Sequence, residues 1–362
     1  MKYTTLLLLF SLTKICPGQV ADTAMDVFKV ETPESSQQFF TNDPVWRGAD
    51  GASSIDLGNG KILWLFSDSF IASDSSGSRK NAVLIRNSIA VQDGYDLPTA
   101  IIRFFWNRKG GNPRAFFHQP GKYWFWTGHG MRINDRVLVF LMKVRSTETG
   151  LGFEVFDWAT VLIQNPDDDP ATWELRYHRG AETYGLIAGS AAVLSDDHYL
   201  YAFGAVEPDT HEAYVLRWKL AQAYKGKMAH PEWWIGDRWE QRKTRLSVPA
   251  PLFMGSTEYS VHYDYRLKKY VQIQSYGFGE AELGLRMADS IVGKWSEPII
   301  FYKPDYTGVK SPIMYAARAH PELLGDGLWI TFNVNSLDFG ALIENQGIYF
   351  PKFILLKIEA KN

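Results

Sequence analysis

Cysteine is almost absent from this chain. Among 362 residues the single cysteine is Cys16, and it lies in an N-terminal segment that we expect to be removed. A mature chain without cysteine forms no disulfide bond, so strand pairing and apolar burial must hold the fold together. Hydrophobic residues make up 46% of the chain and aromatic residues 15%, which is enough for one large core.

Long apolar runs are also missing. The stretch 6–12 is far too short to span a bilayer. With Lys2 before it and Gly18 after it, it is typical of a secretory signal peptide. We therefore expect a signal peptide over residues 1–18, a single domain over 19–362, and a secreted, periplasmic or cell-surface protein without a membrane span. A lipid anchor at Cys16 is the alternative, although Ile15 stands where a lipoprotein signal needs a small residue.

Neither sign of charge is in excess. Lys and Arg number 38 and Asp and Glu number 40, for a formal net charge of −2. Because the basic residues are scattered along the chain, we expect no nucleic-acid partner.

Helical periodicity is scarce as well. Only residues 214–224 place apolar side chains at a 3.6-residue spacing, and we expect a short helix there. Elsewhere hydrophobic and polar residues alternate as in strands.

A short polar turn followed by an aliphatic or aromatic run occurs five times. The turns and runs are 58–60 before 62–66, 134–135 before 137–140, 196–197 before 199–201, 265–266 before 270–273, and 325–327 before 328–332. Their spacing of roughly 60 to 75 residues fits blades with long loops. We predict an all-β fold, a five-bladed β-propeller of four-stranded antiparallel blades around a central channel. A strand near 27–30 would pair with the C-terminal strand 350–358 and close the ring.

Small polar clusters precede each turn, where the first strand of a blade should line the channel. They are 48–51, 128–130, 189–191, 256–258 and 318–320. Gly, Ala and Ser fit this crowded position. The ionisable residues Asp50, His129, Glu258 and His320 do not follow from packing, and we expect them to converge on one mouth of the channel as a functional site.

Hairpin geometry adds a third carboxylate. If Asn59 is the centre of a hairpin, Asp50 lies opposite Asp68, with Cβ atoms about 5 Å apart. Two carboxylates at that distance cannot both ionise freely, so one pKa should be raised. The alternative for Asp68 is a strand cap that binds main-chain amides. For His129 and His320 the alternative is a neutral core histidine bound to a carbonyl group.

The order of short motifs carries a resemblance. The motifs are Gly-Ala-Asp-Gly (48–51), Leu-Phe-Ser-Asp-Ser-Phe (65–70), Arg-Asn-Ser (86–88), Ala-His-Pro-Glu-Leu (319–323), Phe-Asn-Val-Asn-Ser (332–336) and Tyr-Phe-Pro-Lys-Phe (349–353). The chain thus resembles secreted bacterial propellers of a domain-of-unknown-function family that includes endo-D-arabinanases. It is similar in architecture to the five-bladed arabinanase, β-xylosidase and invertase group.

The resemblance implies roles for two carboxylates, Asp50 as base or nucleophile and Glu258 as acid. It also shows a departure, because the second-blade Asp that tunes the acid in those glycosidases is replaced here by Gly128-His129-Gly130. A related group that acts on agar oligosaccharides uses a histidine as the acid. His129 or His320 is therefore the alternative to Glu258.

These observations predict a glycoside hydrolase that acts on an arabinofuranose-type or related polysaccharide or oligosaccharide. Groups on different blades leave room for a water molecule, which favours inversion. Asp50, Glu258 and Asp68 are the predicted catalytic residues; the predicted substrate contacts are Asn87, Trp126, His129, Arg318, His320 and Asn333. We expect a monomer with a carbohydrate substrate, no assigned metal ligand and no required cofactor, and a water or a Ca²⁺ ion in the central channel. The alternative is a propeller that binds glycan without turnover.

Overall fold

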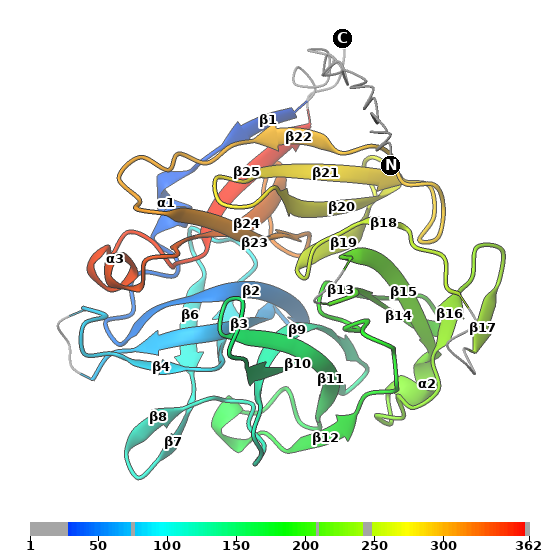
Figure 1. Ribbon diagram of the computed structural model, residues 1–362, viewed down its shortest axis with the longest axis horizontal. Coiled ribbons are helices and arrows are strands. Elements are labelled where there is room, and N and C mark those ends of the chain that lie inside the picture. The colour runs from blue at the N-terminus through cyan, green and yellow to red at the C-terminus, as the bar shows by residue number, and fades with distance from the viewer. Residues whose placement is uncertain (1–27, 74–76, 208–209, 242–247, 359–362) are drawn as a thin grey trace, which may run out of the picture.

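The described residues form five antiparallel sheets around a common centre. A computed structural model describes residues 28–73, 77–207, 210–241 and 248–358. Figure 1 shows the five sheets with their first strands gathered in the middle of the molecule. This confirms the predicted five-bladed β-propeller. The expected signal peptide and Cys16 lie outside the described residues.

The first three blades follow one another along the chain. The first contains β2 (Trp46–Gly58), β3 (Lys61–Ile71), β5 (Ser88–Asp93) and β6 (Ile101–Phe105), with β4 (Val83–Ile85) paired to β3. The second contains β9 (Trp124–Ile133), β10 (Arg136–Ser146), β11 (Phe153–Ile163) and β12 (Leu175–Arg179). The third contains β13 (Ala192–Ser195), β14 (Tyr199–Ala205), β15 (Glu212–Lys219), β16 (Glu232–Trp234) and β17 (Trp239–Gln241), with β18 (Phe253–Met254) paired to β15.

The last blade closes the ring with a strand from the start of the chain. The fourth blade contains β19 (Tyr259–Asp264), β20 (Lys269–Tyr276), β21 (Glu282–Ala288) and β22 (Ile299–Tyr302). In the fifth, β23 (Pro312–His320), β24 (Leu328–Ser336) and β25 (Lys352–Ile358) are joined by β1 (Phe28–Glu31), which pairs with β25. The predicted closing pair is confirmed.

All five predicted turns connect the first and second strands of a blade. The turn at Asn59 and Gly60 has φ values of 54° and 78°, the left-handed backbone that a two-residue hairpin requires and that Asn and Gly adopt readily. The recurrence of this chemistry explains why the blade count was readable from the sequence.

The predicted helix over residues 214–224 is wrong for most of its length. Residues 212–219 form strand β15, and only α2 (Leu220–Ala223) is helical. Val215 and Trp218, which are three residues apart, are buried, while Tyr214 and Arg217 are half-buried. A helix would also bury positions at this spacing. Pairing with β14 and β16 on both sides overrides the helical periodicity.

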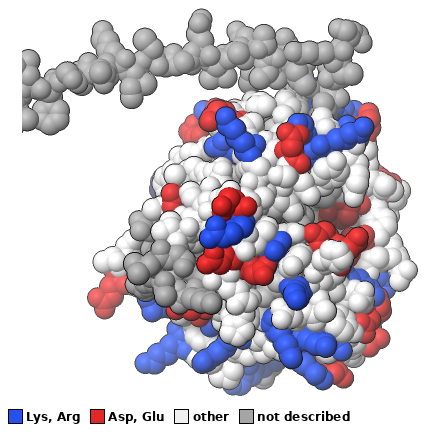
Figure 2. All heavy atoms as spheres, turned by 90° about the vertical axis from the view of Figure 1, so that its right-hand side faces the viewer, with Lys and Arg blue, Asp and Glu red and all other residues white. Residues whose placement is uncertain are grey.

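Short elements occupy the connections. These are α1 (Glu34–Gln37), the hairpin of β7 (Asn107–Lys109) and β8 (Asn112–Arg114), a 3₁₀ turn (Pro170–Thr172) and α3 (Phe339–Glu344). In the part of the chain that the structure describes, no helix has the length and apolar character that crossing a membrane requires. Acidic and basic side chains are interspersed over the upper and middle parts of the face in Figure 2.

Large apolar side chains fill the spaces between blades. Between the first and fifth blades, Phe40 packs edge-on against Trp64 at a centroid distance of 5.0 Å and stacks on Phe353 at 5.1 Å. Between the second and third, Phe140 and Trp158 lie 6.1 Å and 6.0 Å from Trp218 of β15. These contacts lock neighbouring blades together without disulfide bonds.

The five first strands line the channel and run in the same direction. β2, β9, β13, β19 and β23 each contact the next around the ring. We call the end where these strands begin the front end and the other the rear end. In Figure 1, α3, β4 and the β7–β8 hairpin lie on the left, whereas α2 lies on the right.

Candidate active site

Three carboxyl groups meet at the front end of the channel. Asp50 lies in the first half of β2, Glu258 immediately precedes β19, and Asp68 lies near the end of β3. The negative charges of Asp68 and Glu258 both act on Asp50, so the three groups are electrostatically one cluster.

The register of the first hairpin brings Asp50 and Asp68 together. Ser53 pairs with Leu65, as a hairpin centred on Asn59 requires. The register shifts by one residue where Gly51 pairs with Phe66, and the original register is restored where Ala49 pairs with Ser69. Asp50 consequently faces the end of β3 that carries Asp68. The predicted proximity of these two residues is confirmed, although irregularities that the hairpin argument did not foresee lie between the turn and the pair.

Asp50 is held by two tyrosines and has no cationic partner among the residues that the structure describes. The hydroxyls of Tyr315 and Tyr349 lie 3.2 Å and 3.1 Å from Oδ2, and Oδ1 is buried without a hydrogen-bond partner. Burial, and then the charges of Asp68 and Glu258, raise the pKa of Asp50 well above its ordinary value, against the lowering effect of the tyrosines. This carboxyl group is therefore the one in the cluster that retains a proton most readily.

Tyr349 reaches Asp50 because Gly48 lets its backbone approach. A Cβ atom on Gly48 would overlap the main-chain oxygen of Tyr349, and Gly48 has a φ of 106°. The Tyr349 hydroxyl also lies 3.1 Å from the main-chain oxygen of Asp68. Sequence reasoning missed both tyrosines, although Tyr349 begins one of the motifs that carry the resemblance.

Asp68 keeps its charge through two donors. Arg86 Nη1 donates to Oδ2 at 2.8 Å and Trp126 Nε1 donates to Oδ1 at 2.7 Å. Burial raises the pKa of Asp68 to about 6, while Arg86 and Trp126 act to lower it. Both of its oxygens are therefore occupied by protein groups, and neither donor is a main-chain amide of the kind a strand cap binds.

Glu258 is the more open carboxylate. Its Oε1 lies 3.7 Å from Arg318 Nη2, and its side chain is 17% exposed. Burial raises the pKa of Glu258, the Arg318 guanidinium lowers it, and the Glu207 carboxylate raises it further. Arg318 is fixed in turn by the main-chain oxygens of Ser190, at 2.7 Å, and Tyr259, at 3.0 Å.

Glu207 is a fourth acidic residue that sequence reasoning missed. It accepts a hydrogen bond from Thr257 Oγ1, and its Oε1 lies 3.0 Å from His211 Nδ1. It comes from the loop after β14, where no turn motif or repeat marks it. Only the fold brings that loop beside the residue before β19.

His129 and His320 do not join the carboxylates, which corrects the expectation that all four ionisable positions share one mouth. Four residues of strand separate Asp50 from Ser54, or about 13 Å, and both histidines bind at Ser54. His129 Nε2 donates to the Ser54 main-chain oxygen at 3.0 Å, and His320 Nδ1 contacts Ser54 Oγ at 2.5 Å. The blade-five position level with Asp50 belongs to Tyr315.

Both imidazoles are fully engaged by the protein. His129 Nδ1 accepts from the Val193 amide at 2.9 Å, and His320 Nε2 contacts Thr331 Oγ1 at 2.7 Å. Burial, with the nearby Arg318 charge, lowers the pKa of His129 to about 4 and that of His320 well below its usual value. These contacts match the alternative of neutral core histidines.

Two predicted substrate contacts are completely buried. Asn87 donates to the main-chain oxygens of Phe117 and Phe125 at 3.0 and 2.9 Å and accepts from the Phe117 amide at 2.7 Å. Asn333 donates to the Ala49 main-chain oxygen at 2.9 Å. Both side chains are 0% exposed, so they support the site from behind rather than face it.

Trp126 is the predicted contact that does line the front end. It is half-buried, its indole N–H is fixed by Asp68, and its ring packs edge-on against the partly exposed Phe153 at 4.9 Å. Next to it, Arg86 lies over the Trp124 ring at 4.3 Å. The front end thus combines carboxyl groups with an aromatic wall, the composition that sugar-binding sites use.

Metal ligands do not cluster in the described parts of the chain. Over residues 28–73, 77–207, 210–241 and 248–358, no group of three or more His, Cys, Asp or Glu side chains is arranged to hold an ion. In addition, the nitrogens of His129 and His320 already have protein partners. The water or Ca²⁺ expected in the channel stays a prediction.

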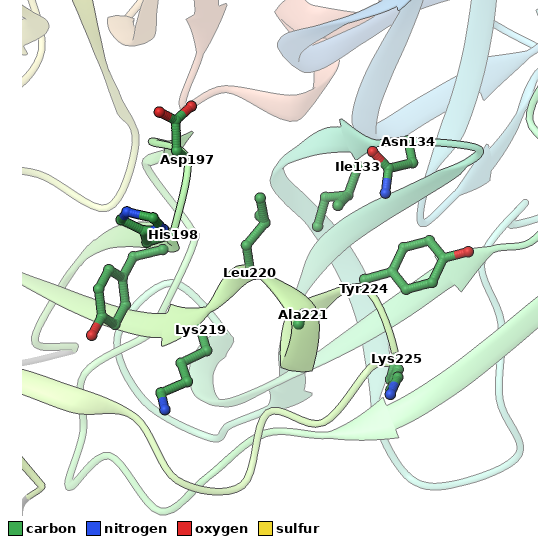
Figure 3. Close-up of a pocket in the computed structure, with 10 residues that line it drawn as sticks. Ile133, Asn134, Asp197, His198, Lys219, Leu220, Ala221, Tyr224 and Lys225 are labelled. Carbon is green, nitrogen blue, oxygen red and sulfur yellow. The ribbon is translucent and has the colours of Figure 1, made fainter.

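A cavity on the surface lies at the rear end, away from the carboxylates. It has a volume of about 630 Å³ between the second and third blades and is lined by residues such as Asn134, Asp197, Lys219 and Tyr224. Figure 3 shows Asp197 pointing away from Lys219 and Lys225, so its charged groups do not converge on a common ligand position. We therefore place the candidate site at the front end.

Comparisons with known proteins agree with the fold. The profile of the family described as Domain of unknown function (DUF5005) matches residues 34–358. No protein with a curated description matches the sequence.

Solved structures align with most of this chain at low sequence identity, and the first of them shares its architecture. A candidate hydrolase from Bacteroides ovatus is 18% identical, with a TM-score of 0.72 over 91% of this chain and 90% of that one. The catalytic domain of the family 62 α-L-arabinofuranosidase of Coprinopsis cinerea is 11% identical, with a TM-score of 0.48 over 92% and 96%. The family 43 enzyme of Xanthomonas citri, solved with xylotriose, is 11% identical, with a TM-score of 0.46 over 91% and 94%.

Proposed function

The chain belongs to the family described as Domain of unknown function (DUF5005), and we propose that it is a glycoside hydrolase whose reaction takes place at the front end of the propeller channel. The observation that carries the proposal is the trio Asp50, Asp68 and Glu258, in which two carboxylates have an arginine partner and the third has none. Hydrolysis of a glycosidic bond by a pair of carboxyl groups needs one protonated and one ionised member.

The partners of the three carboxyl groups indicate which of them carries the catalytic proton. Arg86 and Arg318 stabilise the charged forms of Asp68 and Glu258, whereas only tyrosine hydroxyls contact Asp50. Asp50 therefore holds the proton and acts as general acid. Glu258, whose side chain is 17% exposed and whose Oε1 lies 3.7 Å from Arg318 Nη2, acts as general base, while Asp68 is held too firmly to act on substrate and raises the pKa of Asp50. This reverses the roles that the resemblance implies for Asp50 and Glu258.

The reaction then proceeds in one displacement. Glu258 takes a proton from a water molecule, whose oxygen bonds to the anomeric carbon as the glycosidic C–O bond breaks. Asp50 gives its proton to the departing oxygen. Because the two residues come from the first and fourth blades, there is room for the water between them, and we propose inversion at the anomeric carbon.

An arabinofuranose-type or related substrate is the finer part of the proposal, and it rests on the sequence resemblance. The aromatic wall of Trp126 and Phe153 is suited to either furanose or pyranose rings. Export is likewise proposed from the segment 1–18. Reducing-end product from a panel of arabinans, xylans and arabinogalactans tests the substrate class, and glycan binding without any product would favour a non-catalytic propeller.

Leaving-group chemistry tests the two roles separately. Asp50→Asn should lose about a hundredfold or more in kcat on a natural glycoside but retain most turnover of a dinitrophenyl glycoside, whose leaving group needs no proton. Glu258→Gln should lose turnover of both. The matched control is Asp157→Asn, which changes a partly exposed carboxylate paired with Lys143 at 2.7 Å. Equal losses for Asp50→Asn on both substrates, with unchanged melting, would contradict the acid role.

A further inference from the structure

A second cavity occupies the channel behind the carboxylates. Its volume is about 270 Å³, and its lining includes Ser54, His129, Ser260, His262, Arg318 and Glu322. Arg318 separates it from the front end, since the same guanidinium that lies 3.7 Å from Glu258 also lines this space. The cavity therefore opens toward the rear end.

Buried hydrogen-bonding groups in this cavity lack partners. His262 is only 6% exposed, yet neither ring nitrogen makes a hydrogen bond. Arg318 Nε and Glu322 Oε1 are likewise buried without a hydrogen bond, and Glu322 Oε1 lies 4.0 Å from His320 Nδ1. Ser260 Oγ accepts from the Ala319 amide at 2.8 Å, which leaves its hydrogen free to donate. Because a buried polar group without a partner is costly, this set indicates a ligand or ordered water.

The two arginines that face the cavity are already paired with carboxylates. Arg318 has Glu258 as its partner, and Arg132 donates to both oxygens of Asp167 at 2.7 and 2.8 Å. Burial keeps the pKa of His262 at about 4 and raises that of Glu322 to about 7. An anion would therefore meet no unpaired cationic side chain, and the described residues include no group of three His, Cys, Asp or Glu side chains arranged to hold a metal ion.

We propose that this rear cavity binds a neutral polyhydroxylated molecule of monosaccharide size. Its lining offers both donors and acceptors: a neutral His262 offers one of each, Arg318 Nε and Ser260 Oγ donate, and Glu322 accepts. A sugar hydroxyl is both donor and acceptor, so it matches such a lining better than a halide or a metal ion does. At about 30 Å³ per water, the cavity has room for roughly nine waters or one such molecule.

The proposal does not depend on catalysis at the front end. It gives the channel two sugar sites of different kinds, with Arg318 contacting both. Occupation of the rear cavity would hold Arg318 Nε and so fix the guanidinium that faces Glu258.

Titration with free sugars tests the proposal. We would measure binding of D-arabinose, D-xylose and D-glucose to the full chain by calorimetry, with His262→Leu, Glu322→Gln and Trp126→Ala alongside. His262→Leu removes both nitrogens at similar volume and should weaken binding at least tenfold. Glu322→Gln keeps the shape and tests the acceptor if His262→Leu fails to fold. Trp126→Ala removes an aromatic side chain of the front end that contacts Asp68 rather than Arg318, and it should leave this binding within about twofold, which separates it from binding at the front site.

Crystals soaked with the same sugars and, separately, with bromide locate the occupant. Sugar density between His262 and Arg318 is the expected result. A bromide peak there without sugar, a bound metal ion, water alone, or sugar binding that both His262→Leu and Glu322→Gln leave unchanged would each overturn the proposal.

Discussion

Replacing Asp68 by Asn removes one negative charge beside Asp50 while keeping an oxygen that accepts from Trp126. Cross-strand carboxylates lie about 6 Å apart. At an effective dielectric constant of about 20 to 40, their repulsion is about 1.4 to 2.8 kcal/mol, or about one to two pH units. Arg86 lies 2.8 Å from Asp68 Oδ2 and cancels part of this effect, so we expect a fall of about one unit in the pKa of Asp50.

The pH profile of kcat/KM is the assay. Asp50 must be protonated to act as acid, so its titration forms the alkaline limb, and loss of the Asp68 charge should move that limb to lower pH. Asp157→Asn is the control and should leave it in place. A limb that does not move, or that moves upward, would refute the electrostatic reasoning. Movement of the acidic limb instead would restore Asp50 as the base.

Two further variants follow from the same geometry. Tyr349→Phe removes a hydroxyl that stabilises ionised Asp50, so the limb of the pH profile that reports Asp50 should move to higher pH. An unchanged profile would show that the Tyr315 hydroxyl alone sets this contribution to the pKa of Asp50. Asn87→Ala breaks three buried hydrogen bonds and should lower the free energy of unfolding by about 2 to 4 kcal/mol, measured by urea denaturation. KM at a temperature where the variant is folded should stay within about twofold, and a large rise in KM would return Asn87 to the substrate contacts.

The blades were predictable because their signals are local. Turns such as Asn59-Gly60 require a backbone that few residues adopt, and each precedes a strand that must be buried. The region 214–224 failed because its apolar spacing suits a helix as well as a doubly paired strand, and only the neighbouring strands decide between them. Local patterns therefore identify hairpins better than they identify single elements.

The candidate site was predictable only in part. Asp50 and Asp68 come from one hairpin, so counting along the chain brought them together. Tyr315 and Glu207 reach the site from other blades, and their neighbours depend on register shifts such as the one between Tyr315 and Arg318. His129 and His320 occupy positions that look equivalent to Asp50 in sequence but lie further along their strands.

The pairing of β1 with β25 has a consequence for how the molecule forms. Among the strands that the structure describes, residues 28–31 are synthesised before all the others and their partner strand, 352–358, after all the others. Until then the fifth blade lacks strands and the ring stays open, with unpaired strand edges in that blade and uncovered apolar faces on its neighbours. Completion of this one sheet is therefore the step that commits the chain to a closed molecule. A circular permutant that begins between two blades, with residues 28–31 fused after the last strand, should close its ring without waiting for a distant segment.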